Sequence, residues 1–164
     1  MTNTKLNNDN LTTDTINDLT VFCDNLESQP DVDQVIDHIT DGDTDFTVDN
    51  VRFISADHID QVLRDEILDP SDTYELGCYS AHFLSDLSGI SSDTIKAMQK
   101  AELYQVIGEE VLHCVERGYS QWSQDFTRLF TIYDGSYGAH FNNHDGSEEE
   151  INLNGHVYYV FDNQ

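Results

Sequence analysis

Any compact fold of this chain has to hold together against a formal net charge of −25 over 164 residues. The imbalance arises because 32 Asp and Glu residues face only 7 Lys and Arg residues. A net charge of this size disfavours the compact state through self-repulsion. The fold therefore has to place its carboxylates at the surface, around a core that only the apolar residues can supply.

The apolar residues are numerous enough to build such a core. Hydrophobic residues make up 38% of the chain and include 8 Phe and 8 Tyr, which separates the sequence from disordered acidic tails. The length fits a single domain. We expect a flexible N-terminal arm over residues 1–12, which show no period, followed by one acidic domain over residues 13–164.

Helical periodicity dominates residues 13–132. Apolar residues recur at i, i+3 and i+4 over residues 13–28, 32–39 and 57–68, each of which predicts a helix. We expect a central helix from residue 72 to residue 87 and a longer one from residue 92 to Gly118, with a kink near Ala101. The same spacing continues from Trp122 to Thr131.

Short alternating segments predict the strands. Residues 46–54 are expected to form one strand or extended segment. Beyond Tyr133, Gly, Asn and Asp separate short alternating runs, which predicts an antiparallel meander over residues 133–164 with strands at 138–142, 148–153 and 156–161. Asn154-Gly155 is a good two-residue hairpin turn. The expected class is therefore α+β, mainly helical with a small C-terminal antiparallel sheet.

Two groups of residues could hold a metal, and neither has the required pattern. Oxygens at alternate positions, as in a helix-loop-helix calcium site, come from Asp41, Asp43, Asp45, Thr47 and Asp49. Phe46 stands where such a loop needs Gly, and Arg52 stands where it needs a bidentate Glu. Three imidazoles and one carboxylate come from His140, His144, His156 and Asp145, without the usual spacing of zinc ligands. We expect no metal and no cofactor.

Catalytic motifs are also missing from the sequence. It contains no G-x-S-x-G segment and no phosphate-binding G-x-x-x-x-G-K-[ST] loop. Bringing a phosphate toward so negative a chain is electrostatically unfavourable, which argues against nucleotide substrates and direct nucleic-acid binding. We expect no catalytic residues, and hence no enzyme.

The cysteines and the absence of targeting segments indicate the cytoplasm. Cys23, Cys78 and Cys114 are odd in number and lie in apolar periodic segments, which predicts buried, reduced thiols. No apolar run is long enough to span a membrane, and the N-terminus lacks a signal-peptide pattern.

The charge of the whole chain approaches that of duplex DNA. A compact domain of this length has a radius of gyration near ~15 Å and is roughly 40 Å across. Since B-DNA carries one phosphate per ~1.7 Å of axis, ~40 Å of duplex holds about 24 charges. Helical i, i+4 pairs such as Asp14 and Asp18 lie about 5–6 Å apart. Repeated like-charge pairs are unfavourable, which suggests that they serve a function.

We therefore predict that carboxylates bind a basic partner in the way that phosphates do. The candidate residues are Asp14, Asp18, Asp24, Asp31, Asp33, Asp37, Asp41, Asp43, Asp45, Asp49, Asp57, Asp60, Asp65 and Asp69. They lie in the more acidic N-terminal part of the chain. The expected partner is a basic DNA-binding host protein or nuclease, such as a restriction, CRISPR or recombination enzyme.

In size and charge the chain resembles the phage- and plasmid-encoded DNA mimics such as Ocr and the ArdA-type antirestriction proteins. The likeness is one of composition, not of motif. The C-terminal segment YGAHFNNHDGSEEEINLNGHVYYVF is similar to small phage proteins. The resemblance implies a non-catalytic inhibitor that occupies the DNA groove of a host defence enzyme in the host cytoplasm.

Three other interpretations stay open. The chain could be an acidic adaptor or inhibitor that binds a basic protein outside the DNA-binding class, or an enzyme whose site has no known motif. It could also be a salt-adapted protein, although such proteins are usually rich in Ala and this chain has 5. A homodimer contact through the central helices and the sheet is a further open alternative.

Overall fold

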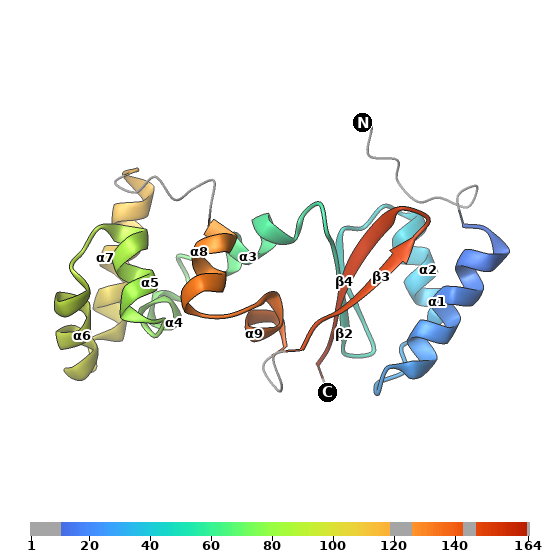
Figure 1. Cartoon of the computed structure of the whole chain (residues 1–164), viewed down its shortest axis with the longest axis horizontal. Coiled ribbons are helices and arrows are strands. Elements are labelled where there is room, and N and C mark those ends of the chain that lie inside the picture. Colours follow the sequence, from blue (N-terminus) through green and yellow to red (C-terminus); the bar gives the residue numbers. More distant parts are fainter. Residues whose placement is uncertain (1–10, 119–125, 143–146, 164) are drawn as a thin grey trace. The chain divides into compact units, whose positions relative to one another are not determined.

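The computed structural model describes residues 11–118, 126–142 and 147–163 (Figure 1). The mainly helical α+β class predicted from the sequence is confirmed. Contacts within the chain divide it into two compact units. Unit 1 comprises residues 1–59 and 137–164, and unit 2 comprises residues 60–136. The expected single domain over residues 13–164 stays a prediction. Of the expected arm, residues 1–10 lie outside the described residues.

In its described part, unit 1 combines three helices with a four-stranded antiparallel sheet in the order β1-β2-β4-β3. The elements are α1 (Thr13–Asn25), α2 (Val32–Thr40), β1 (Asp45–Val48), β2 (Val51–Ser55), α9 (Tyr137–Phe141), β3 (Glu149–Leu153) and β4 (His156–Asp162). The central pair joins β2 to β4 with the register Phe53 opposite Val160. The sheet is therefore assembled from both ends of the chain, whereas the sequence analysis assigned it to the C-terminal end.

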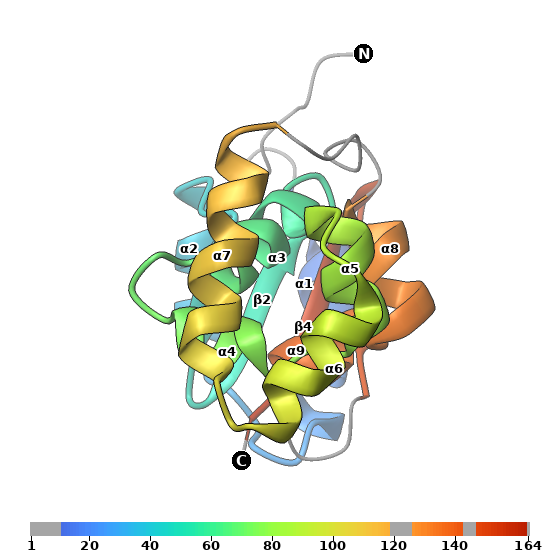
Figure 2. The same cartoon turned by 90° about the vertical axis from the view of Figure 1, so that its left-hand side faces the viewer.

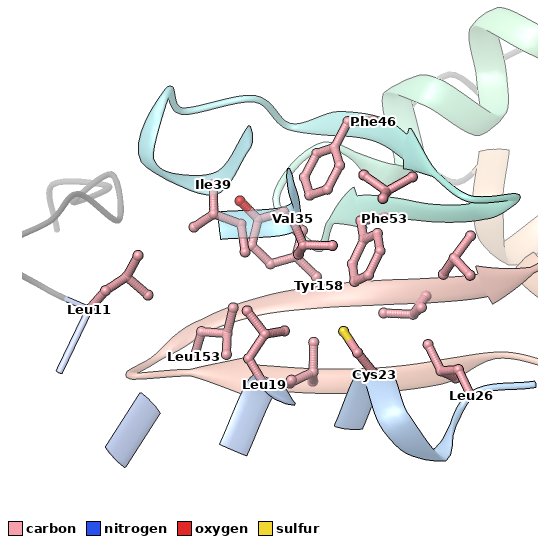
Figure 3. Close-up of a cluster of buried hydrophobic side chains, with 14 residues drawn as sticks. Leu11, Leu19, Cys23, Leu26, Val35, Ile39, Phe46, Phe53, Leu153 and Tyr158 are labelled. Carbon is pink, nitrogen blue, oxygen red and sulfur yellow. The ribbon is translucent and has the colours of Figure 1, made fainter. Parts of the chain in front are cut away.

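Helices α1 and α2 cover one face of this sheet. Their buried side chains, including Leu19 and Cys23 of α1 and Val35 and Ile39 of α2, form one cluster with Phe46, Phe53, Leu153 and Tyr158 of the strands (Figure 3). Successive strand residues alternate between faces, so one sheet face supplies all these strand contacts. Burial of this cluster fixes which side of each helix faces the solvent.

Both helices begin at capped residues, as the sequence leads one to expect. The Thr12 hydroxyl accepts a hydrogen bond from the Thr15 amide, and the Asp31 carboxylate accepts one from the Gln34 amide. These bonds satisfy amides that have no partner inside the helix. The start of each helix is therefore determined locally.

The segment predicted as one strand over residues 46–54 is instead a hairpin. β1 and β2 are joined by Asp49 and Asn50, whose φ angles are 50° and 69°. Two consecutive positive φ angles define the tight turn that matches the twist of antiparallel strands. The prediction missed the turn because Asp-Asn is a weaker signal than Asn-Gly.

The predicted strand at 138–142 is wrong, because residues 138–141 belong to helix α9 and Asn142 lies just beyond its end. A helix places Tyr137 and Phe141 on the same side, one turn apart. From there Tyr137 contacts Tyr159 at 5.2 Å between ring centroids, and Phe141 contacts Phe161 at 5.1 Å. Packing against the second face of the sheet therefore makes this segment helical, although its local alternation of apolar and polar residues predicts a strand.

Unit 2 is entirely helical in its described part. It contains α3 (Ile59–Ile67, of which Ile59 is assigned to unit 1), α4 (Thr73–Gly77), α5 (Ala81–Ser88), α6 (Ser92–Lys100), α7 (Tyr104–Glu116) and α8 (Phe126–Tyr133). Its core includes Leu76, Phe83, Leu84, Leu87, Val111 and Phe130, each at most 2% exposed. Trp122, placed in a helix by the sequence analysis, lies outside the described residues.

Two helices expected to be continuous are each divided. The segment from 72 to 87 breaks after Gly77, and the Ser80 hydroxyl caps α5 by accepting from the Phe83 amide. The segment from 92 to Gly118 breaks after Lys100, where Glu102 has a φ of 60°. The expected kink near Ala101 is therefore a full interruption.

The division after Gly77 allows α4 to lie directly against α7 (Figure 2). Gly77 faces the backbone of Tyr104, and Gly108 faces the backbone of Thr73. A Cβ atom at either glycine would overlap the facing carbonyl oxygen. The two helices can approach this closely only because glycine occupies both crossing points.

Asp134 joins the end of α8 to the start of α5. Its carboxylate accepts hydrogen bonds from the Ser80 amide at 3.1 Å and the Ser80 hydroxyl at 3.0 Å. Burial raises the pKa of the Asp134 carboxyl above its usual range, although both bonds from Ser80 act in the opposite direction. The folded state therefore holds a proton on Asp134 more tightly than the unfolded state does.

We predict that Asp134→Asn increases stability relative to the wild type as pH rises. Because the folded-state pKa is raised, the contribution of Asp134 to stability is present below the unfolded pKa and is lost as pH rises through the folded pKa. Asn has no such charge and keeps an acceptor for the Ser80 amide. Urea unfolding from about pH 3.5 to about pH 7 should show a growing advantage of Asp134→Asn.

Asp134→Ala is the matched control for this variant. It also removes the charge but leaves the Ser80 amide without its acceptor, so it should be about 1 kcal/mol less stable than Asp134→Asn at every pH. A constant difference between Asp134→Asn and the wild type across the pH range would contradict the assigned pKa direction.

Candidate interaction face

The fourteen candidate aspartates are surface residues. Twelve are exposed, Asp43 and Asp69 are half-exposed, and none is buried. Eleven belong to unit 1, whereas Asp60, Asp65 and Asp69 belong to unit 2. The structure therefore brings most of the predicted set together in one unit.

Half of these aspartates have a structural role through their side chains. The seven that accept hydrogen bonds or pair within the chain are Asp31, Asp43, Asp45, Asp49, Asp60, Asp65 and Asp69. Two bonds from Ser71, through its side chain and its amide, hold the pKa of Asp69 below its usual range. Their contribution to the local fold accounts for these residues without a partner protein.

The other seven make no side-chain hydrogen bond or ion pair with the described part of the chain. They are Asp14, Asp18 and Asp24 of α1, Asp33 and Asp37 of α2, Asp41 at its C-cap, and Asp57. All seven are exposed. We call the six on α1 and α2, without Asp57, the acidic face, and none of these six makes a side-chain bond to the described chain.

Helix geometry gathers these carboxylates away from the core. Asp14 and Asp18 are separated by four residues, as are Asp33 and Asp37, so each pair lies on one side of its helix. The opposite sides carry Leu19 and Cys23 in α1 and Val35 and Ile39 in α2, all in the core cluster. α1 and α2 contact each other over the sheet (Figure 1), so their outward sides form neighbouring surfaces.

The electrostatic environment of the acidic face is almost free of cations. Unit 1 holds 18 acidic and 2 basic residues, net −16, whereas unit 2 holds 14 and 5, net −9. In the described part of unit 1 Arg52 is the only Lys or Arg. Its guanidinium pairs with both oxygens of Asp45 at 2.8 and 2.7 Å and lies over the Phe141 ring. This cation is therefore neutralised.

The predicted set omitted all glutamates and the apolar residue at the acidic face. Glu148, Glu149 and Glu150 are exposed at the start of β3, and the S-E-E-E run in the sequence could have identified them. Val21 is 60% exposed, and helical spacing places it between Asp18 and Asp24. The same helical spacing puts Val21 on the side opposite the buried Leu19 and Cys23, so the sequence pattern could have identified it.

Only some of the residues considered as metal ligands lie within the described part of the chain. His140 lies in α9 and His156 begins β4, whereas His144 and Asp145 lie outside the described residues. Within the described ranges no group of three or more His, Cys, Asp or Glu residues is arranged to hold a metal ion. Asp45 and Thr47, from the calcium-loop candidate, belong to strand β1.

The cysteines differ from the prediction of three buried thiols. Cys23 is buried, but Cys114 is half-buried and Cys78 is exposed, and all three are free. Burial, followed by the neighbouring charge of Asp24, raises the pKa of Cys23 to about 11. In the ranges described, no helix is long and apolar enough to cross a membrane.

Comparison of the chain with protein-family models, with curated proteins and with solved structures finds no match.

Proposed function

We propose that this protein is a non-catalytic DNA mimic that occupies the nucleic-acid groove of a basic host protein in the cytoplasm. The observation that carries the proposal is the acidic face itself. Its six exposed carboxylates make no side-chain bond to the described residues, although like charges at this spacing oppose helix formation. A groove lined with Arg and Lys would gain counterion release from them as it does from phosphates.

The dimensions of the helices suggest how much nucleic acid the face can imitate. α1 has 13 residues and is therefore about 20 Å long at 1.5 Å per residue. One strand of B-DNA carries about six phosphates over that length, and the duplex carries about twelve. The six carboxylates therefore match the charge of one DNA strand over this length. The total charge of the chain, by comparison, matches that of a longer stretch of duplex.

The expected partner is a restriction, CRISPR or recombination enzyme, or another protein that binds nucleic acid through a basic groove. Affinity capture from a bacterial lysate at low salt should retain such proteins on the immobilised chain. Duplex or single-stranded DNA should then elute them, because the nucleic acid and the acidic face compete for one groove. A captured set that DNA fails to elute would contradict the proposal.

A second candidate function is an acidic adaptor that binds a basic protein outside the DNA-binding class. The specific observation in its favour is Val21, an apolar side chain exposed within the acidic face. An adaptor would use this side chain as an apolar anchor, so its binding would resist salt. Capture that survives high salt, fails to respond to DNA and is lost on Val21→Ser would favour the adaptor.

A further inference from the structure

Unit 2 contains a hollow that the acidic face does not include. It lies between the end of α3 and the C-terminal half of α7 and has a volume of about 530 Å³. Four apolar residues line it, namely Leu68, Pro70, Leu112 and Val115. Leu68, Leu112 and Val115 are only half-buried, so the hollow presents apolar surface to the solvent.

The position of the hollow follows from the packing of α7. Val111 is fully buried and Gly108 lies against the backbone of α4, so α7 is held on that side. Leu112 and Val115 follow on the adjacent side of the helix, toward the segment from Leu68 to Pro70. The volume is within the range of about 300–1,000 Å³ that is usual for binding sites.

The charged lining residues, which we call the rim of the hollow, are mainly anionic. Asp65 and Glu116 are exposed carboxylates, and Arg64 is the single cation among the lining residues. Asp65 accepts a bond from Gln61 at 2.7 Å, and Arg64 already has an interaction within the chain. Glu116 makes no side-chain bond in the part of the chain described. Glu109, one turn before Leu112 on α7, adds a further exposed carboxylate.

The four apolar lining residues, which we call the floor, together with the acidic rim favour an occupant of the complementary composition. Aliphatic side chains would cover Leu68, Leu112 and Val115, and flanking Lys or Arg residues would meet Asp65 and Glu116. Since Leu112 and Glu116 are one turn apart on α7, a helix that carries its own apolar and basic residues at i, i+3 and i+4 offers the matching spacing.

We infer that this hollow is a docking site for a basic amphipathic helix of a partner protein. Aliphatic side chains of that helix fill the hollow, and its cations pair with the rim. The site is independent of the acidic face in unit 1 and gives the protein a second, partly apolar means of recognition. Such contacts resist salt better than the contacts of the acidic face.

A designed peptide tests the inference on the full chain. The probe is a labelled Leu/Lys peptide of ~18 residues with Leu at helical spacing, and the control peptide has the same composition with Leu on all sides. In about 0.15 M salt, fluorescence anisotropy should show about tenfold tighter binding of the amphipathic peptide. Equal affinity of the two peptides would overturn the inference.

Two variants identify the hollow as the place of binding. Leu112→Ser should reduce the preference for the amphipathic peptide about fivefold, because it removes apolar surface from the floor. The double variant Asp65→Asn with Glu116→Gln should lower the affinity for the amphipathic peptide by a similar factor. Asp65 and Glu116 are exposed and Leu112 is half-buried, so none of the three substitutions removes a side chain from the buried core.

The matched control removes two charges elsewhere in unit 2. Asp93→Asn with Glu110→Gln changes the net charge by the same amount at exposed positions outside the hollow. It should alter the affinity less than about twofold. If the control pair weakens binding as much as the rim pair, the peptide responds to diffuse charge and the docking site is rejected.

Discussion

Gly108→Ala is expected to unfold unit 2 or to cost about 3–5 kcal/mol of its stability. A Cβ atom at this position would lie 2.6 Å from the carbonyl carbon of Thr73 and closer still to its oxygen. Because the obstacle is backbone within the short helix α4, no side-chain rotation can relieve it. Either α4 separates from α7, or the core around Leu76 and Val111 opens.

Gly77→Ala should have the same effect from the opposite side of the crossing, since its Cβ would lie 2.7 Å from the carbonyl carbon of Tyr104. Urea unfolding and thermal melts of both variants provide the measurement. The double variant should cost less than the sum of the single ones, because once the helices have separated the second methyl group has no obstacle.

Gly89→Ala is the control for these substitutions. No atom lies within 4 Å of its added Cβ, but its φ of 81° remains unfavourable for alanine. The cost there should be about 1 kcal/mol, which reflects backbone strain alone. If Gly108→Ala costs no more than Gly89→Ala, the close contact of α4 with α7 does not exist in solution.

Neutralising four carboxylates of the acidic face should reduce the affinity for a captured DNA-binding partner about 100- to 1,000-fold at ~0.1 M salt. The variant combines Asp14→Asn, Asp18→Asn, Asp33→Asn and Asp37→Asn, which are all exposed and make no side-chain bond in the described chain. Each carboxylate that replaces a phosphate contributes about 0.9 to the slope of log affinity against log salt. The slope should therefore fall by up to about 3.6.

The control removes four charges from unit 2 at exposed positions, namely Asp93, Glu102, Glu109 and Glu110, each replaced by its amide. Both variants lower the magnitude of the net charge from −25 to −21, so a difference between them reports position and not total charge. Equal losses of affinity for the two variants would mean that the partner responds to the net charge of the whole chain and has no preference for α1 and α2.

Folding cannot explain the expected loss of affinity. Asp14 and Asp18 repel each other across one helical turn, as do Asp33 and Asp37, so their neutralisation relieves unfavourable pairs worth a few tenths of a kcal/mol each. Asp14 and Asp33 also lie in the first turns of their helices, where a negative charge is favourable by a similar amount, so the two effects offset each other and the variant should melt close to the wild type.

Local signals were sufficient for the elements whose boundaries depend on neighbouring residues. Thr12 and Asp31 cap their helices, and the apolar spacing that follows predicts α1 and α2. Asn154 and Gly155 have φ angles of 54° and 88°, which confirms the predicted hairpin turn between β3 and β4. Each of these features requires contacts across only a few residues.

The division of the candidate aspartates could not be read from their spacing. Asp33 and Asp45 look alike in the sequence, yet only Asp45 is neutralised, by an Arg52 that the β1–β2 hairpin brings beside it. Asp49 similarly accepts the Asp31 amide across 18 positions of the chain. Whether a carboxylate is available to a partner therefore depends on the pairing of elements.

The sequence by itself determined the high negative charge, the helical and hairpin periodicities and the exposure of the aspartates, because each follows from composition or from contacts within a turn or two. Tertiary structure alone decided that β2 pairs with β4 across about a hundred residues, that residues 137–141 are helical, and that Gly77 and Gly108 bring two helices into backbone contact. These outcomes depend on which surfaces, distant from each other in the sequence, bury one another. No short stretch of residues contains the information that decides between the alternative packings.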